Sequence, residues 1–238
     1  MFDFEDQVII VTGAGGNLGN AVVKAMLHGY GTVCGLYHRK ASLTKELQDA
    51  VKDERLYLYE GIDVTDREGL LSLGKKIQSD FGKVDVLVNT VGGFTAGETV
   101  YELAPATWEK MLDLNVHSFL NTTAAFVPLM LDGGRGKIVS VGSKSALDGT
   151  AKTGAYAAAK GALLRLTESL AKELMDENIQ VNCVLPGTMD TPENREAMPK
   201  ANYDHWVKLE QVADAILYLS SSSADAISGA ALPVYGQS

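Results

Sequence analysis

The sequence predicts an α/β fold: a doubly wound, mostly parallel sheet of seven strands with helices on both faces. Three observations support this prediction. Apolar runs rich in β-branched residues alternate with helix-like segments along the chain, a rhythm typical of right-handed β-α-β units. The first run leads into a glycine-rich turn and an amphipathic segment, "VIIVTGAGGNLGNAVVKAML". There is no repeat, low-complexity tract or linker-like stretch, so a single domain is expected over residues 1–238.

Seven segments have the composition and length of buried strands. Short continuous apolar runs of this kind are typical of parallel strands that helices cover on both faces. The expected strands are residues 8–11, 32–37, 56–60, 84–89, 137–141, 180–185 and 231–235.

The segments between these strands have the periodicity of helices, with apolar residues three and four positions apart. The expected helices are residues 18–28, 42–52, 66–80, 105–131, 153–177 and 210–221. Residues 187–209 contain two prolines and interrupt the rhythm. A long irregular segment of this kind is a candidate lid over a site.

Composition and charge exclude several classes of protein. The start, "MFDFEDQ", is acidic and unlike a secretory signal, and the most apolar helical stretch, from Phe119, is too short and polar to span a bilayer. A cytoplasmic protein without a membrane partner is therefore expected. The net charge of -9, without a lysine/arginine block, argues against a nucleic-acid partner. The four histidines show no metal-ligand spacing, and the cysteines, Cys34 and Cys183, lie in apolar runs, so no metal site is expected.

The glycine-rich turn departs from the usual dinucleotide fingerprint. A G-x-G-x-x-G pattern starting at Gly13 has its second glycine at Gly15, but its third position is Leu18 rather than Gly19. The turn can still hold a diphosphate, because glycines allow the backbone to approach closely and the next helix presents free N–H groups. The alternative is a turn with a structural role alone.

A tyrosine and a lysine one helical turn apart form the second candidate site. Tyr156 and Lys160 share one face of a predicted helix, where the ammonium can lower the pKa of the phenol and make it a general acid or base. The spacing alone is weak evidence, because it arises easily by chance. Its context adds weight: the helix is rich in small residues, and Ser143 follows the strand before it, at the same edge of the sheet.

Several motifs in order along the chain resemble those of the short-chain dehydrogenase/reductase family, over essentially the whole length. They are "TGAGGNLG" at 12–19, "DVT" at 63–65, "VDVLVNTVGG" at 84–93, "LNV" at 114–116, Ser143, "YAAAK" at 156–160 and "VNCVLPGTMDT" at 181–191. The resemblance implies a Rossmann fold and an oxidoreductase that interconverts a carbonyl and an alcohol with a nicotinamide cofactor. The substrate would be a small molecule such as a 3-oxoacyl thioester or another ketone.

The resemblance also implies catalytic roles for four residues. Tyr156 would exchange a proton with the substrate oxygen, and Ser143 would hydrogen-bond that oxygen as charge develops. Lys160 would also bind the nicotinamide ribose. Asn115 would connect Lys160 to a proton relay through a water molecule; a role in helix packing is the alternative for Asn115.

The cofactor contacts implied by the resemblance follow the ends of the strands. Near the diphosphate they are Gly13, Gly15, Gly16, Asn17, Leu18 and Gly19. Along the adenosine and the sheet edge they are Tyr37, His38, Arg39, Asp63, Val64 and Asn89. Near the nicotinamide they are Tyr156, Lys160, Pro186, Gly187, Thr188, Met189 and Thr191. A helix cap is the alternative for Thr191.

The end of the second strand bears on the choice of cofactor. An acidic residue there binds the ribose 2′-hydroxyl of NAD, whereas a basic residue accommodates the 2′-phosphate of NADP. Here the string is "LYHRK", residues 36–40, without an acid and similar to that of pteridine reductases. NADP(H) is therefore expected and NAD(H) is the alternative, since the string can also be an exposed basic turn.

The sequence differs from the common family pattern in three places. "NTVGG" replaces Asn-Asn-Ala-Gly, the chain ends in "VYGQS" where an acid and paired glycines are frequent, and Asn17 stands at a usual glycine position. Asparagine tolerates left-handed backbone, so Asn17 could replace glycine with little strain and add an amide near the phosphates.

Two other functions stay open at this point. The first is that of the dihydropteridine reductase branch, in which hydride goes to a quinonoid ring. The chain resembles this branch at Asn17, at "ALDGT" and over residues 190–206, but Ser143 and "YHRK" differ from the pattern of the branch. A redox sensor that binds a dinucleotide without turnover is the third candidate. Its weakness is that a sensor has no chemical need for the four catalytic residues together.

Two further expectations concern the substrate and assembly. Large apolar residues would line the substrate pocket unless they pack in the core: Phe94, Leu147, Met189, Met198 and Trp206. The helices around 108–131 and 153–174 resemble those of the family's dimer and tetramer interfaces, so a homo-oligomer is expected, with simple packing on the sheet as the alternative.

Overall fold

Seven parallel strands form the central sheet of the computed structural model, which describes residues 2–38 and 45–237. In chain order they are β1 (Val8–Thr12), β2 (Thr32–Tyr37), β3 (Leu56–Glu60), β4 (Val86–Asn89), β5 (Gly136–Val141), β6 (Ile179–Pro186) and β7 (Ala231–Val234). Their spatial order is β3-β2-β1-β4-β5-β6-β7. The order reverses between β1 and β4, and in such sheets ligands bind beside the carboxyl ends of the strands at this point.

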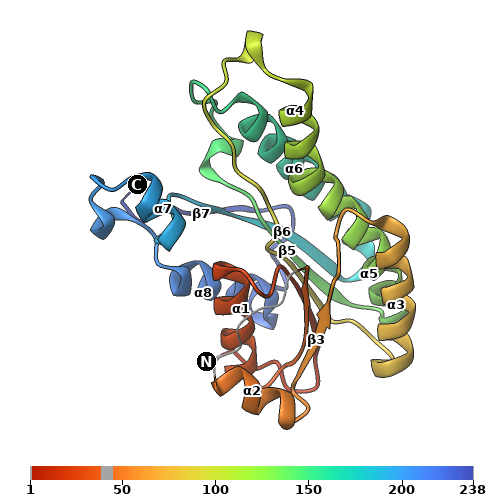
Figure 1. Cartoon of the computed structure of the whole chain (residues 1–238). Coiled ribbons are helices and arrows are strands. Elements are labelled where there is room, and N and C mark those ends of the chain that lie inside the picture. Colours follow the sequence, from red (N-terminus) through yellow and green to blue (C-terminus); the bar gives the residue numbers. More distant parts are fainter. Residues whose placement is uncertain (1, 39–44, 238) are drawn as a thin grey trace.

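Helices cover both faces of the sheet (Figure 1). On one face lie α1 (Asn17–His28), α2 (Lys45–Lys52) and α8 (Leu209–Ser220); on the other lie α3 (Arg67–Phe81), α4 (Pro105–Leu112), α5 (Ser118–Gly133) and α6 (Gly154–Glu173). Neighbouring strand residues alternate between the two layers: Ile9 belongs to the cluster under α1 and α8, and Ile10 to the cluster under α3 and α5. The predicted doubly wound fold is confirmed.

A π-helical turn, Asp113–His117, separates α4 from α5. The predicted helix over residues 105–131 is confirmed as α4, this turn and α5 in succession, and the π-helical turn inside it was not predicted. The turn brings the amide of Asn115 onto the backbone of Gly93: Nδ2 donates to the Gly93 carbonyl at 3.1 Å and Oδ1 accepts from the Gly93 N–H at 3.2 Å. π-Turns of this kind are frequent at functional sites.

Residues 187–209, which we call the lid segment, are more ordered than the irregular composition indicates. They contain α7 (Pro192–Ala197) and a 3₁₀ turn (Tyr203–His205), and Met189 pairs with Val207 in an isolated parallel bridge. The C-terminal tail packs on this segment, because the Gln237 N–H donates to the His205 carbonyl at 3.1 Å.

A charged cluster around Asp85 holds the amino-terminal edge of the sheet together. Asp85 is only 5% exposed. Its carboxylate accepts the Val8 N–H at 2.9 Å and both Nε and Nη2 of Arg135, at 3.1 and 2.9 Å. Nζ of Lys83 lies 3.0 Å from Oδ2, the same oxygen that accepts the Val8 N–H. Buried carboxylates persist only when they are paired and hydrogen-bonded in this way.

Asp85→Ala is expected to lower the free energy of unfolding by about 2–3 kcal/mol, because it removes charge-assisted hydrogen bonds from a buried backbone N–H and a guanidinium. Urea unfolding followed by circular dichroism measures the change. The matched control is Asp80→Ala, which breaks the exposed ion pair with Lys76 and should cost less than about 1 kcal/mol. Equal losses in both variants would contradict a special role for Asp85.

Within the described part of the chain, no helix has the length and apolar character needed to cross a membrane.

Candidate active site

The turn after β1 has a shape that only glycines allow. Gly13 has a φ of 65°, and a Cβ there would lie 2.9 Å from Oγ1 of Thr90. A Cβ on Gly19 would lie 2.1 Å from the carbonyl oxygen of Gly13, so the first turn of α1 packs directly on the loop. The start of α1 carries no acidic residue, and its free N–H groups favour an anion. These features fit the diphosphate of a dinucleotide.

Asn17 does not take the left-handed conformation that its place in the loop suggests. It is the first residue of α1, Gly16 caps the helix, and the positive φ belongs to Gly13. The tolerance of asparagine for left-handed backbone is therefore not used at this position. Its Nδ2 donates a hydrogen bond of 2.7 Å to Oε2 of Glu193 on α7, so the amide faces the lid segment.

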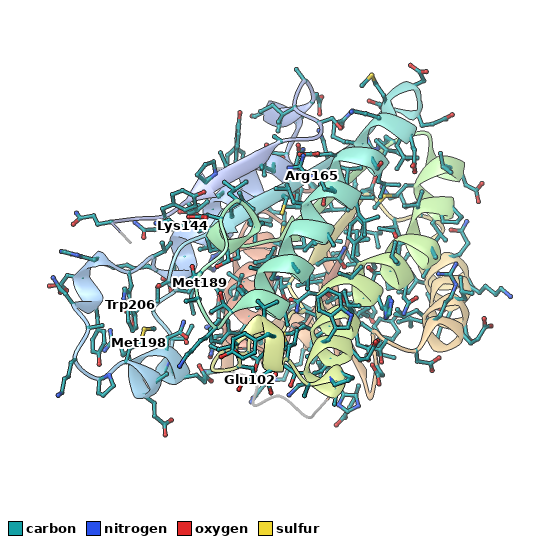
Figure 2. All side chains as sticks on the ribbon, turned by 90° about the horizontal axis from the view of Figure 1, so that it is seen from above. Glu102, Lys144, Arg165, Met189, Met198 and Trp206 are labelled. Atoms are coloured by element: carbon teal, nitrogen blue, oxygen red, sulfur yellow. The ribbon has the colours of Figure 1, made fainter. Side chains whose placement is uncertain are left out.

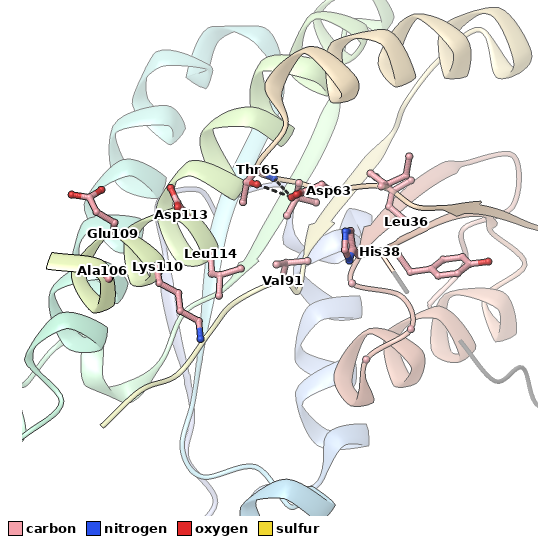
Figure 3. Close-up of a pocket in the computed structure, with 16 residues that line it drawn as sticks. Leu36, His38, Asp63, Thr65, Val91, Ala106, Glu109, Lys110, Asp113 and Leu114 are labelled. Atoms are coloured by element: carbon pink, nitrogen blue, oxygen red, sulfur yellow. Dashed lines mark hydrogen bonds between the residues drawn. The ribbon is translucent and has the colours of Figure 1, made fainter. Parts of the chain in front are cut away.

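A cavity of about 690 Å³ opens beside this loop (Figure 3). The predicted residues that line it are Gly13, Gly15, Gly16, Tyr37, His38, Asp63 and Val64. Nine further lining residues were not predicted as contacts: Leu36, Ile62, Thr65, Val91, Ala106, Glu109, Lys110, Asp113 and Leu114. Thr65, Val91 and Leu114 belong to motifs quoted above, and Asp113 and Leu114 directly precede Asn115, which were the signals available for these four. Arg39 lies outside the described residues.

The Asp63 turn is held rigidly at the rim of the cavity. Its Oδ1 accepts hydrogen bonds from the Thr65 N–H at 2.8 Å and the Thr65 hydroxyl at 2.7 Å, and these bonds lower the pKa of the carboxyl group. From α5, Nδ2 of Asn121 donates to the carbonyls of Val64 and Thr65 at 3.2 and 3.0 Å. Asn121 is another residue that sequence reasoning missed.

Ser143 and Tyr156 meet at the carboxyl edge of β5. Ser143 caps the 3₁₀ turn Lys144–Ala146, where its Oγ accepts the Ser145 N–H at 3.1 Å. The Ser143 side chain also faces the phenol of Tyr156, close enough to affect its pKa. Burial raises the pKa of Tyr156 above its ordinary value, and the Ser143 side chain only partly opposes this. The prediction that Lys160 lowers the pKa of Tyr156 is therefore wrong.

Lys160 is only 4% exposed and points under the tyrosine. Its Nζ donates to the Val141 carbonyl at 2.8 Å and lies 5.9 Å from the centre of the Tyr156 ring. Burial lowers the pKa of Lys160 to about 8. Gly92 separates Lys160 from Asn115: a Cβ at position 92 would lie 3.0 Å from Nζ and 2.9 Å from the Asn115 Oδ1. The structure thus brings Asn115, Ser143, Tyr156 and Lys160 to one edge of the sheet.

The predicted residues after β6 lie along the lid segment. The Gly187 N–H donates to the Val234 carbonyl, and the Thr188 carbonyl accepts the Val207 N–H. The Oγ1 of Thr191 accepts the Asn194 N–H at 3.2 Å and caps α7, which is the alternative role considered for it.

Two other predicted cofactor residues are largely enclosed. Leu18 packs in the core under α1. Asn89 is buried at the end of β4, and within the described part of the chain its Nδ2 has no hydrogen-bond partner.

The predicted substrate residues divide into two groups. Phe94 is 67% exposed, and its ring meets Tyr156 edge to face, with centroids 5.0 Å apart; Leu147 and Met198 are also exposed. Trp206 is buried against Tyr203, and Met189 packs partly on the core. Figure 2 shows Met189 between Lys144 and the outer part of the lid segment, which carries Met198 and Trp206. Trp206 is thus a packing residue of the lid segment.

Both cysteines are free and buried, and burial raises the pKa of the Cys183 thiol to about 11. Among residues 2–38 and 45–237, no three His, Cys, Asp or Glu side chains gather as a metal site would require.

Comparisons with known proteins agree with this arrangement. The model of the short chain dehydrogenase family matches residues 7–202. The chain is 31% identical over 194 residues to an uncharacterized oxidoreductase of Staphylococcus saprophyticus, covering 81% of this chain and 82% of that one. It is 29% identical to the 3-oxoacyl-[acyl-carrier-protein] reductase of Thermotoga maritima, covering 98% and 97%. The aldohexose dehydrogenase of Thermoplasma acidophilum superposes with a TM-score of 0.88 at 25% identity, covering 100% and 96%.

Proposed function

The chain belongs to the short chain dehydrogenase family, and from this premise we propose that it interconverts a carbonyl and an alcohol with NAD(P)(H). The observation that carries the proposal is the meeting of Ser143 and the Tyr156 phenol at the carboxyl edge of β5, with the buried ammonium of Lys160 5.9 Å from the centre of the tyrosine ring. These groups stand at the carboxyl edge of the sheet, which also carries the glycine turn and its cavity. A proton donor and a dinucleotide site are the two parts that carbonyl reduction needs.

The residues along this edge fit a nicotinamide dinucleotide. The bare backbone of residues 13–19 and the N-terminus of α1 would hold the diphosphate. The adenosine would lie in the cavity between His38, Asp63 and Leu114. When bound, the nicotinamide supplies or accepts the hydride.

The side chains supply the proton and the polar contacts. Because burial raises the pKa of Tyr156, the phenol keeps its proton at neutral pH and can donate it to a carbonyl oxygen. The Ser143 hydroxyl would hydrogen-bond the same oxygen as negative charge develops on it. Lys160 places a positive charge beneath the phenol, and Asn115 holds the backbone of Gly93 at the side of the site.

The surroundings of Tyr156 favour an uncharged substrate. Phe94 is exposed against the ring of Tyr156, and Leu147 is exposed at the end of the 3₁₀ turn that Ser143 caps. Asp190 and Arg195 of the lid segment neutralise each other at 2.6 Å. A ketone of the 3-oxoacyl type is a reasonable first candidate, given the similarity to the Thermotoga reductase. A quinonoid dihydropterin is the second, because of the local resemblance of residues 146–150 and 190–206 to that branch.

A substrate panel tests the proposed reaction. The purified protein would be assayed by absorbance at 340 nm with simple ketones, a 3-oxoacyl thioester and quinonoid dihydropterin, each with NADPH and with NADH. Reduction of a ketone or thioester supports the proposal, and turnover of the dihydropterin alone would favour the second candidate. Tight binding of the dinucleotide without any turnover would instead indicate a sensor.

The proposed preference for NADP(H) rests on the basic string that ends β2. Arg39→Ala should raise the KM for NADPH by about 10-fold or more while changing that for NADH less than about two-fold, because only NADPH carries a 2′-phosphate for the guanidinium to bind. Steady-state kinetics with both cofactors measures this. The matched control is Lys40→Ala, which removes the adjacent charge. Equal losses for the two cofactors in Arg39→Ala would overturn the assignment.

A further inference from the structure

A side-chain hydrogen bond joins two residues that are 176 positions apart in the sequence. Nδ2 of Asn17 donates to Oε2 of Glu193 at 2.7 Å. Asn17 directly follows Gly15 and Gly16, which line the proposed cofactor cavity. Glu193 lies in the first turn of α7, in the lid segment. The contact therefore connects the loop proposed to hold the diphosphate to the segment proposed to cover the substrate.

The Glu193 carboxylate is fixed by several donors. The pKa of the Glu193 carboxyl group is lowered, although partial desolvation opposes this. The backbone N–H of Glu193 lowers the pKa most, and the side chains of Thr191 and Asn17 lower it further. Thr191 is itself fixed, since it is buried and caps α7. The acceptor thus stands on a helix whose first turn is fixed by a buried cap.

The other side-chain bonds of α7 stay within the lid segment. Arg195 forms a two-point contact with Asp190 at 2.6 and 2.7 Å, and Nδ2 of Asn194 donates to the Met189 carbonyl at 2.8 Å. Among the hydrogen bonds that α7 side chains make with described residues, the bond from Asn17 to Glu193 is the one that reaches the body of the protein. A glycine at position 17 cannot make it.

We propose that Asn17 and Glu193 are positioning residues that latch the lid segment onto the glycine turn. The latch keeps Met189 and α7 beside the cofactor site while the substrate enters. Its consequence for turnover rests on the proposed function, whereas its effect on the position of the lid segment does not.

Limited trypsin digestion tests the latch without any need for activity. Lys200 is exposed in the lid segment, and cleavage after it, followed by mass spectrometry, reports how often the segment opens. Asn17→Ala and Glu193→Ala should each be cleaved about five-fold faster than the wild type, the scale of one exposed charge-assisted hydrogen bond. The double variant should be cleaved no faster than either single one, because the two side chains share one bond.

Two control variants separate the latch from other effects. Glu193→Gln keeps a carbonyl acceptor and should be cleaved at nearly the wild-type rate. Glu196→Ala removes a carboxylate from the same helix without touching Asn17, and should also be cleaved like the wild type. Wild-type cleavage of Asn17→Ala, or multiplied rates in the double variant, would overturn the latch.

Kinetics then test its role in the reaction. Asn17→Ala and Glu193→Ala should raise the KM of the carbonyl substrate several-fold more than they lower kcat, and Glu193→Gln should restore the wild-type KM. Faster cleavage with an unchanged KM would contradict the positioning role. If the wild type reduces no carbonyl at all, the proposed function fails, and the digestion alone decides on the latch.

Discussion

Tyr156→Phe lowers kcat for carbonyl reduction by about 10²-fold or more and leaves the Kd of the cofactor unchanged. Loss of a positioned proton donor has this magnitude, and the substitution removes only the hydroxyl that faces Ser143. The ring that packs edge to face on Phe94 is kept, so the shape of the site is preserved. Single-turnover kinetics and fluorescence titration of the reduced cofactor measure the two quantities.

Tyr203→Phe serves as the matched control, because its hydroxyl donates to a backbone carbonyl within the lid segment, at 3.3 Å from the Arg195 oxygen, and not to Ser143. Turnover near the wild-type level in Tyr156→Phe would disprove the assignment of the proton donor. A parallel loss in both tyrosine variants would show that the effect arises from packing.

Lys160→Met abolishes turnover and, at pH 7, raises the free energy of unfolding by about 2 kcal/mol. The pKa of Lys160 falls from 10.5 to about 8 on burial, which corresponds to a cost of roughly 3 kcal/mol for the charged form. The variant also loses the hydrogen bond to the Val141 carbonyl, which reduces the expected gain in unfolding free energy by about 1 kcal/mol. Urea unfolding of both proteins between pH 7 and pH 10.5 measures the difference.

The pH dependence has a definite sign. Below about pH 8 the amine is charged in both the folded and the unfolded wild type, so the full cost of burial is present. Between pH 8 and pH 10.5 the unfolded chain binds more protons than the folded one, and the wild type gains stability as the pH rises. The advantage of the methionine variant must therefore shrink over this window. An advantage that stays constant would contradict a buried ammonium at neutral pH.

Lys137→Met provides the contrast. Lys137 is similarly buried, but its Nζ lies 2.6 Å from the Asp225 carboxylate. The substitution breaks an ion pair as well as removing a buried charge, so no gain in stability is expected.

Local patterns in the sequence are sufficient to predict most of the architecture. The strands are short apolar runs, and all seven lie where their composition places them. The central strands are buried, because parallel strands covered on both faces leave little room for polar residues. The spacing of Tyr156 and Lys160 predicts one helix face in the same local way. The residues of the cavity follow strand ends, which is why so many of them could be anticipated.

The features that escaped prediction depend on partners distant in the sequence. The π-helical turn exists where Asn115 binds the backbone of Gly93, and no periodicity reports such a contact. Asn17 is helical and bonded to Glu193 rather than left-handed. The pKa of Tyr156 is governed by burial more than by its neighbour Lys160, and burial emerges only once the chain is folded.

The internal bonding of the lid segment makes it an exchangeable part. Its ion pair, its helix cap and the bridge between Met189 and Val207 all close within residues 187–209, so the segment brings its own shape to wherever it is grafted. A graft must also keep the contacts that hold the segment in place: the packing of Val207 in the core, the backbone bonds to Val234 and Gln237, and the bond from Asn17 to Glu193. With these contacts kept, the proposed substrate residues can vary within this segment while Ser143, Tyr156 and Lys160 stay unchanged.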